Sequence, residues 1–169
     1  MKSGKLVAAA LVAVVALGAL VVAQDTAKKE HIIVTPDDIK WGDAPSSLPP
    51  GAKAAVLEGD PKKEGYFCMR LKLPAGYKIP AHWHPGEERV TVISGKFNVG
   101  LGDTLDESKT KALPPGGYFS FPAKTNHFAI IGEETVVQLS TLGPWGLTYV
   151  NPDDDPRKGA ATFKCAKDG

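Results

Sequence analysis

Short apolar runs separated by Gly and Pro restrict what this chain can fold into. From Lys53 onward, runs of β-branched and aromatic residues alternate with turns such as the one at Gly95. This pattern is typical of strands in a β-sandwich or β-barrel. Candidate strands span residues 54–57, 66–73, 78–82, 89–94, 96–101, 118–121, 127–131, 135–141 and 147–150. The charged stretch 103–112 is expected to be a surface loop or a single helical turn. We therefore predict an all-β fold, with enough strands to enclose a filled interior.

The chain begins with a segment typical of exported proteins. Lys2 and Lys5 precede an apolar run that ends at Ala23, and polar residues follow. Basic, apolar and short residues in this order are typical of a signal peptide, so we expect cleavage after Ala23 and a periplasmic or secreted protein. An uncleaved membrane anchor is the alternative, because the run approaches the roughly 18–20 residues that a bilayer requires. No stable membrane association is expected after cleavage.

The length of 169 residues fits one folded domain. We predict a signal peptide over residues 1–23, a polar and proline-rich N-terminal arm over residues 24–52, a β-barrel over residues 53–150 and a charged C-terminal tail over residues 151–169. Thr35 and Pro36 are expected to begin a short helix in the arm.

The charge balance indicates no nucleic-acid partner. The chain has 20 Lys and Arg against 19 Asp and Glu, and loss of residues 1–23 would remove two lysines and no acidic residue. The mature net charge would then be about −1, whereas nucleic-acid binders carry a basic patch or stripe. Cys68 and Cys165 are the only cysteines. An exported chain could join them in a disulfide, and a buried free thiol at Cys68 is equally compatible with its apolar run.

Three of the four histidines fit one geometric scheme. His82 and His84 are two residues apart in a predicted strand, where alternate side chains point to the same face. Glu88 continues this even spacing, and His127 comes from a later strand. Three neutral imidazoles and one carboxylate suit a divalent ion such as Mn, Fe, Co, Ni, Cu or Zn. The sequence therefore predicts a mixed nitrogen and oxygen metal site.

These residues resemble the first motif of the cupin superfamily. That motif has Gly, five residues, His-x-His, three or four residues, Glu, six residues and Gly. The chain has Gly76, His82, His84, Glu88 and Gly95 at these positions. Every fixed position of the first motif is therefore matched.

A second cupin motif is matched with two departures. Its fixed positions are Gly, Pro-x-Gly, His and Asn, and the chain has Gly116, Pro122, Lys124, His127 and Ile131 there. Lys124 replaces the usual Gly of a tight turn, and Ile131 replaces Asn. Neither departure removes a ligand, but Lys124 puts the tight turn in doubt.

The resemblance implies a cupin jelly-roll β-barrel with one divalent transition metal inside. Its ligands would be His82, His84, Glu88 and His127, and the ion would be Mn, Fe, Ni, Cu or Zn. Glu88 is also a candidate for taking up a proton during catalysis. Glu87 is the alternative carboxylate, although its parity directs it away from the histidines. Cupins are often dimers, so a homodimer is compatible with the resemblance.

Three functions remain open at this point. The first is an exported metal-dependent oxidoreductase of the dioxygenase type that acts on a small organic molecule. The second is a metal-binding or ligand-sensing module without turnover, and the third is a metal-free barrel. The residues 143–157 and 39–41 are similar to small bacterial cupins, some of them grouped with the cupin lobe of zinc-dependent anti-sigma factors, and this likeness names no substrate.

Overall fold

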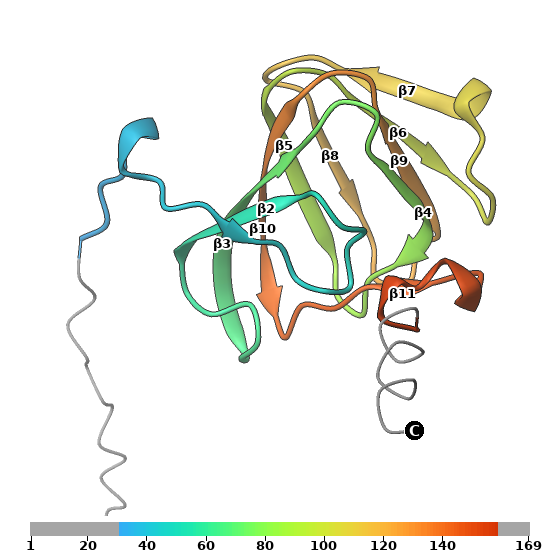
Figure 1. The fold of residues 1–169 in the computed structure, drawn as a ribbon. Coiled ribbons are helices and arrows are strands. Elements are labelled where there is room, and N and C mark those ends of the chain that lie inside the picture. Colours follow the sequence, from blue (N-terminus) through green and yellow to red (C-terminus); the bar gives the residue numbers. More distant parts are fainter. Residues whose placement is uncertain (1–30, 159–169) are drawn as a thin grey trace, which may run out of the picture. The chain divides into compact units, whose positions relative to one another are not determined.

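Two antiparallel sheets surround a common interior in the computed structural model, which describes residues 31–158 (Figure 1). One sheet has the strand order β1-β2-β3-β10-β5-β8 and the other has β11-β4-β9-β6-β7. The strands of the first sheet are β1 (Gly42–Asp43), β2 (Lys53–Glu58), β3 (Gly65–Leu73), β10 (Thr135–Gly143), β5 (Glu88–Ser94) and β8 (Tyr118–Phe121). Those of the second are β11 (Thr148–Tyr149), β4 (Lys78–Trp83), β9 (His127–Ile131), β6 (Phe97–Leu101) and β7 (Thr110–Leu113). This arrangement confirms the predicted all-β jelly-roll barrel.

Alternation along the strands builds the core. On β3, Phe67 and Met69 are almost fully buried, and β10 contributes Val137 and Leu139 to the same cluster. Side chains two residues apart share a face of a strand, so these residues line the interior together. Burial of such apolar surface is the main favourable contribution to folding.

A β-bulge in β4 decides which way its histidines point. Ile79 pairs with Ala129 and His82 pairs with His127, so three steps along β4 face two steps along β9. Without the bulge, Ile79 and His82 would lie on opposite faces, because side chains alternate. The extra residue, at Pro80 or Ala81, lets both side chains face the interior, as bulges commonly do near functional sites.

The segment 103–112 was expected to be a surface loop or a single helical turn, and it contains such a turn but ends in a strand that was not predicted. It contains a short 3-10 helix, η2 (Glu107–Lys109), and then enters β7 at Thr110. Strand β7 pairs with β6 at the edge of its sheet. The sequence of β7 does not show the hydrophobic alternation typical of a strand, because Lys111 and Ala112 have no strong strand preference. Its pairing with β6 identifies it as a strand. Strand β1 was also missed.

Part of the predicted arm belongs to the barrel core. Leu48 is buried and joins the hydrophobic cluster. Tyr77 donates its hydroxyl to the Pro49 carbonyl oxygen at 2.5 Å, and Tyr149 donates to that of Ser47 at 2.8 Å. These two bonds fasten residues 47–49 to the barrel. The short helix expected near Thr35 is present as η1 (Pro36–Asp38), and another 3-10 helix, η3 (Pro152–Asp154), follows β11.

Some expectations fall outside the described residues. Contacts divide the chain into two units, residues 1–31 and 32–169, and the predicted signal peptide lies in the first. Cys165 also lies outside the described range, while Cys68 is buried and its sulfur accepts a hydrogen bond from Ser140 at 3.4 Å. Within residues 31–158, no helix combines the length and the apolar character needed to cross a membrane.

The turn that precedes β9 keeps its tight geometry without glycine. Lys124 has φ of 62°, in the left-handed region that glycine normally occupies. Its backbone N–H donates to the carbonyl oxygen of His84 at 2.9 Å, and that of Thr125 donates to Pro122 at 3.3 Å. The doubt raised by the missing glycine is therefore resolved by the backbone, and the turn links the two histidine-bearing segments.

This conformation predicts opposite effects for two substitutions at Lys124. A β-branched residue is strongly disfavoured in the left-handed region, so we expect Lys124→Val to lower the free energy of unfolding by about 1–3 kcal/mol. Lys124→Gly relieves the strain at some cost in unfolded-chain entropy, so its stability should equal or exceed that of the native chain. Urea denaturation of the two variants tests this, and equal destabilisation by both would contradict the assigned turn.

Candidate metal centre

Three imidazoles converge inside the barrel from two adjacent strands. His82 lies near the end of β4, His84 follows that strand directly, and His127 begins β9. One ring nitrogen from each histidine lies within 4.8 Å of those of the other two, and all three residues are buried. The structure thus brings together the three histidines that the sequence singled out. His31, the fourth, is exposed in the arm.

Backbone carbonyls hold each of these rings in one orientation. Nδ1 of His82 lies 2.8 Å from the Pro80 carbonyl oxygen, and Nδ1 of His127 lies 2.9 Å from that of Thr125. Nδ1 of His84 lies 2.6 Å from the carbonyl oxygen of Gly146. Because a carbonyl only accepts hydrogen bonds, Nδ1 is the protonated nitrogen in each ring. The Nε2 lone pairs are left free to face the common point, which is the arrangement found around protein-bound metals.

Glu88 completes the group from the opposite sheet. It starts β5 and shares the inward face with Val90 and Val92, and only 9% of it is exposed. Its carboxylate oxygens lie 3.3 Å from Nε2 of His84 and 3.0 Å from Nε2 of His127. The Glu88 carboxylate therefore lies against two of the three converging imidazoles, those of His84 and His127.

Burial and mutual charge set the protonation of this cluster. Desolvation by burial lowers the pKa of His82 to about 3, and the neighbouring His127 and His84 add to this effect. Burial also acts to lower the pKa of His84, but the charge of Glu88 outweighs it and raises that pKa. For Glu88 burial acts in the raising direction, and the nearby His84 and His127 prevail and lower its pKa. At neutral pH the site therefore presents a neutral His82 and an ionised Glu88.

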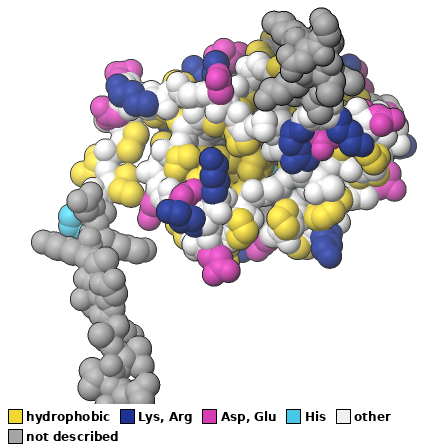
Figure 2. All heavy atoms as spheres, turned by 60° about the horizontal axis from the view of Figure 1, so that its bottom comes forward, with side chains coloured by type: hydrophobic (Ala, Val, Ile, Leu, Met, Phe, Trp, Pro, Cys, Tyr) yellow, Lys and Arg dark blue, Asp and Glu magenta, His cyan; other side chains and the backbone are white. Residues whose placement is uncertain are grey.

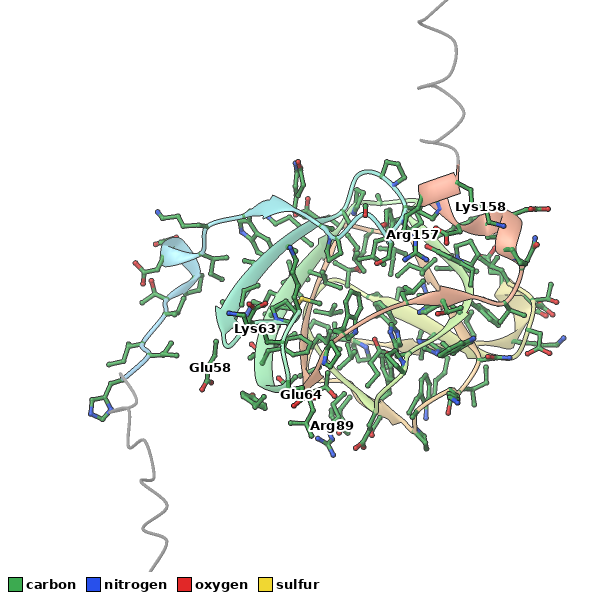
Figure 3. All side chains as sticks on the ribbon, turned by 90° about the horizontal axis from the view of Figure 1, so that it is seen from below. Glu58, Lys63, Glu64, Arg89, Arg157 and Lys158 are labelled. Carbon is green, nitrogen blue, oxygen red and sulfur yellow. The ribbon has the colours of Figure 1, made fainter. Side chains whose placement is uncertain are left out.

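Glu87 lies outside this cluster, as its parity predicts. Its carboxylate lies 2.5 Å from the Arg89 guanidinium and accepts a hydrogen bond from Ser120 at 2.7 Å. Figure 3 shows Arg89 pointing away from the barrel interior. The Glu87 backbone carbonyl accepts a hydrogen bond from Thr141. Glu87 thus fastens the segment that carries Glu88 rather than contributing to the site.

The four side chains line a small cavity. Its volume is about 30 Å³, and apolar residues from both sheets form the rest of its wall. A buried water needs roughly 10–15 Å³ of such space, so the cavity has room for an ion with one or two waters. Phe97, Phe119 and Trp145 are among the residues that line it. Phe128 packs against Gly100, and Tyr149 is buried.

The residues present fit a divalent metal ion. Nε2 of His84 and Oε2 of Glu88 are fully buried and make no hydrogen bond of normal geometry. Buried polar atoms of this kind are rare in folded proteins because they lose their interaction with water. A cation at the point where the lone pairs meet would satisfy both atoms. The donor set of three imidazoles and one carboxylate suits a transition metal better than Mg²⁺ or Ca²⁺, which prefer oxygen ligands.

Two residues near the centre were not assigned there from the sequence. Leu48, from the predicted arm, lines the metal cavity. The indole of Trp145 stacks on His84 with ring centroids 5.3 Å apart. Both come from segments rich in Pro and Gly that have no strand periodicity. Only the folded contacts reveal their position.

One curated relative shares part of its sequence with this chain. It is germin-like protein 3-1 of Oryza sativa subsp. japonica, which is 34% identical over 86 residues. The match covers 50% of this chain and 34% of the relative. The chain therefore spans about a third of the length of that relative.

Several solved structures share the fold. The polyketide cyclase RemF from Streptomyces resistomycificus superposes with a TM-score of 0.64 at 16% identity, over 78% of this chain and 94% of its own. A proposed acetylacetone dioxygenase from Methylibium petroleiphilum gives 0.57 at 24% identity, over 76% and 87%. An RmlC-like cupin from Shewanella frigidimarina gives 0.51 at 18% identity, over 68% and 91%. At these identities the likeness shows the fold alone.

A family model gives the more direct assignment. The domain of unknown function DUF4437 matches residues 23–145, which include the whole histidine cluster and Glu88. This match places the chain: it has the fold of the RmlC-like cupin above and belongs to the DUF4437 family.

Proposed function

We propose that this protein is an exported metal-dependent cupin in which His82, His84, Glu88 and His127 hold one divalent transition metal, and that it acts as an oxidoreductase on a small organic molecule. The observation that carries the proposal is the convergence of three imidazole nitrogens within 4.8 Å, each ring being fixed through Nδ1 to a backbone carbonyl. Such anchoring makes the rings ready for a cation before it binds.

His82 and Glu88 would have different roles at such a centre. A bound ion would polarise an oxygen donor of the substrate and, if redox-active, exchange electrons with it. His82 stays neutral because of its burial and so offers a lone pair over a wide pH range. Glu88 is ionised and would bind the ion through its carboxylate, and on moving off the ion the same carboxylate would take up a substrate proton.

Some of the structurally similar proteins support the enzyme hypothesis. Two of them are described as a polyketide cyclase and a proposed acetylacetone dioxygenase, which act on small organic molecules by name. The alternative is a non-catalytic cupin that binds a metal or small ligand. It is favoured by the cavity of about 30 Å³, which leaves little space beside an ion.

Export is part of the proposal and rests on the signal-like residues 1–23. N-terminal sequencing of the protein from its own host is its test, with Gln24 as the expected first residue. A mature chain that retains Met1 would contradict it.

Metal binding should depend on the converging histidines and not on the exposed one. We expect the native chain to bind one divalent ion, and His127→Ala to bind it at least about tenfold more weakly. At a free metal concentration of 100 times Kd, the ion should add about 2.7 kcal/mol to the stability of the folded state. Isothermal titration and thermal denaturation with Zn²⁺ or Mn²⁺ measure these effects, and a chelator should reverse the stabilisation.

His31→Ala is the matched control, because His31 is exposed in the arm. It should bind the metal as the native chain does. An equal loss of metal affinity in both variants would favour the metal-free barrel. So would a melting temperature that changes with neither metal nor chelator.

The metal affinity should fall on acidification. The pKa of His84 is raised above 6.5 because the charge of Glu88 outweighs burial. A metal ion must therefore displace a proton from His84 below that pKa, whereas His82 carries no competing proton until about pH 3. We expect roughly a tenfold loss of affinity per pH unit between about pH 7 and 5. Competition titrations at several pH values measure the slope, and an affinity that is unchanged over this range contradicts the site.

Turnover distinguishes the enzyme from the binder. Metal-loaded protein is supplied with phenols, flavonoids, oxalate and thiols while oxygen uptake and substrate loss are followed. We expect at least one class to be converted by the native chain and not by His127→Ala. Metal retention without conversion of any class would support the non-catalytic alternative.

A further inference from the structure

A second hollow lies between the free edges of the two sheets. Strand β7 is the last strand of one sheet and β8 is the last strand of the other. Between them is a groove of about 340 Å³, which we call the edge groove. This volume lies within the range of roughly 300–1,000 Å³ that is usual for small-molecule sites. The edge groove is therefore large enough for a compact organic ligand, unlike the metal cavity.

The edge groove combines apolar surface with positive charge. Leu101 and Tyr118 are exposed there, at 57% and 55% respectively. Lys109 and Lys111 also line it, and the lining includes no acidic residue. Lys109 lies 3.0 Å from Asp106, whereas Lys111 makes no ion pair among the residues 31–158. An unpaired ammonium beside exposed apolar side chains is complementary to an apolar anion.

The ladder places Lys111 on the inward face of β7. Lys111 pairs with Val99 of β6, and paired residues of antiparallel strands share a face of the sheet. Val99 is buried in the barrel core. The Lys111 side chain thus starts from the interior side of the edge and extends along the groove. Elsewhere charges are mixed: on the face shown in Figure 2, basic and acidic side chains both surround apolar ones.

Two phenylalanines of β8 separate the edge groove from the metal cavity. Phe119 lines both hollows, and Phe121 lines the edge groove. Their ring centroids are 4.8 Å apart, and the ring of Phe121 lies 5.1 Å from that of His127. Both side chains are only partly buried. One wall of the edge groove therefore lies next to His127, a residue of the candidate metal centre.

We propose that the edge groove binds a small apolar carboxylate, with its apolar body against Leu101, Tyr118 and Phe121 and its charge near Lys111. The binding itself does not require a metal. Its role as the substrate site of the metal centre rests on the proposed function above.

An inward-facing lysine on an edge strand has another established use. It prevents sheets from associating edge to edge. That role requires no ligand and predicts that removal of the charge causes self-association. The two explanations for Lys111 are therefore separable by experiment.

Two probes of the same shape test the proposal. 2-Naphthoate and its uncharged analogue 2-naphthamide are titrated into the full-length protein, with amide chemical shifts as the readout. We expect shifts concentrated in β7, β8 and Leu101, and naphthoate to bind about two- to fivefold more tightly than naphthamide, as for one exposed charge pair. The preference should shrink in high salt because exposed charges are screened.

Lys111→Met should abolish the preference for naphthoate. Lys78→Met is the matched control, because Lys78 is exposed on β4 and lies outside the edge groove, and it should leave the preference intact. Shifts far from β7 and β8, equal binding of the two probes to the native chain, or an unchanged preference in Lys111→Met would each overturn the proposal. Self-association of Lys111→Met with an unchanged preference would assign the residue to edge protection.

The measurement is repeated with chelator-treated protein and with His127→Ala. Naphthoate binding that persists in both, while metal binding fails, would refute only the proposed function. Metal binding that persists while the naphthoate preference is absent would refute only the edge-groove proposal.

Discussion

The structure depends on keeping four polar side chains inside an apolar barrel. Each imidazole loses its water on burial and regains one hydrogen bond through Nδ1 to a backbone carbonyl. Within residues 31–158, ionised Glu88 has no such backbone partner and is stabilised by His84 and His127. An isolated buried charge would be expensive, so the carboxylate and the histidines are held together as a group. A cation would be the fifth member of that group.

The scaffold around this group is tied at three separate places. The bulge in β4 directs His82 inward, and the turn at Lys124 binds the backbone of His84. The hydroxyls of Tyr77 and Tyr149 fasten residues 47–49, which bring Leu48 over the cavity. None of these contacts involves the Nε2 atoms of the three histidines or the carboxylate of Glu88. They account for how residues from β4, β5 and β9 can meet within a few ångströms.

Much of the fold and of the candidate site could be predicted from the sequence because both follow from local sequence patterns. The bounds of β8 and β9 match the predicted ranges, and the two-residue spacing of His82 and His84 does put them on one face. Strand β7 could not be predicted, because Lys111 belongs to an edge and has no apolar alternation. Leu48 and Trp145 lie in segments without periodicity, and only long-range contacts place them at the cavity.

The bulge in β4 also means that the number of residues between Ile79 and His82 decides which face of the sheet the following histidines occupy. Between Ile79 and His82 the chain holds one residue more than a regular ladder would allow. Loss of that residue would restore regular pairing between β4 and β9. The side chains of His82 and His84 would then face outward, whereas the apolar residues before the bulge would keep their positions. Such a chain could still fold as a barrel and yet lack its centre. Members of the family with a one-residue length change here would thus be expected to lack the cluster of converging imidazoles.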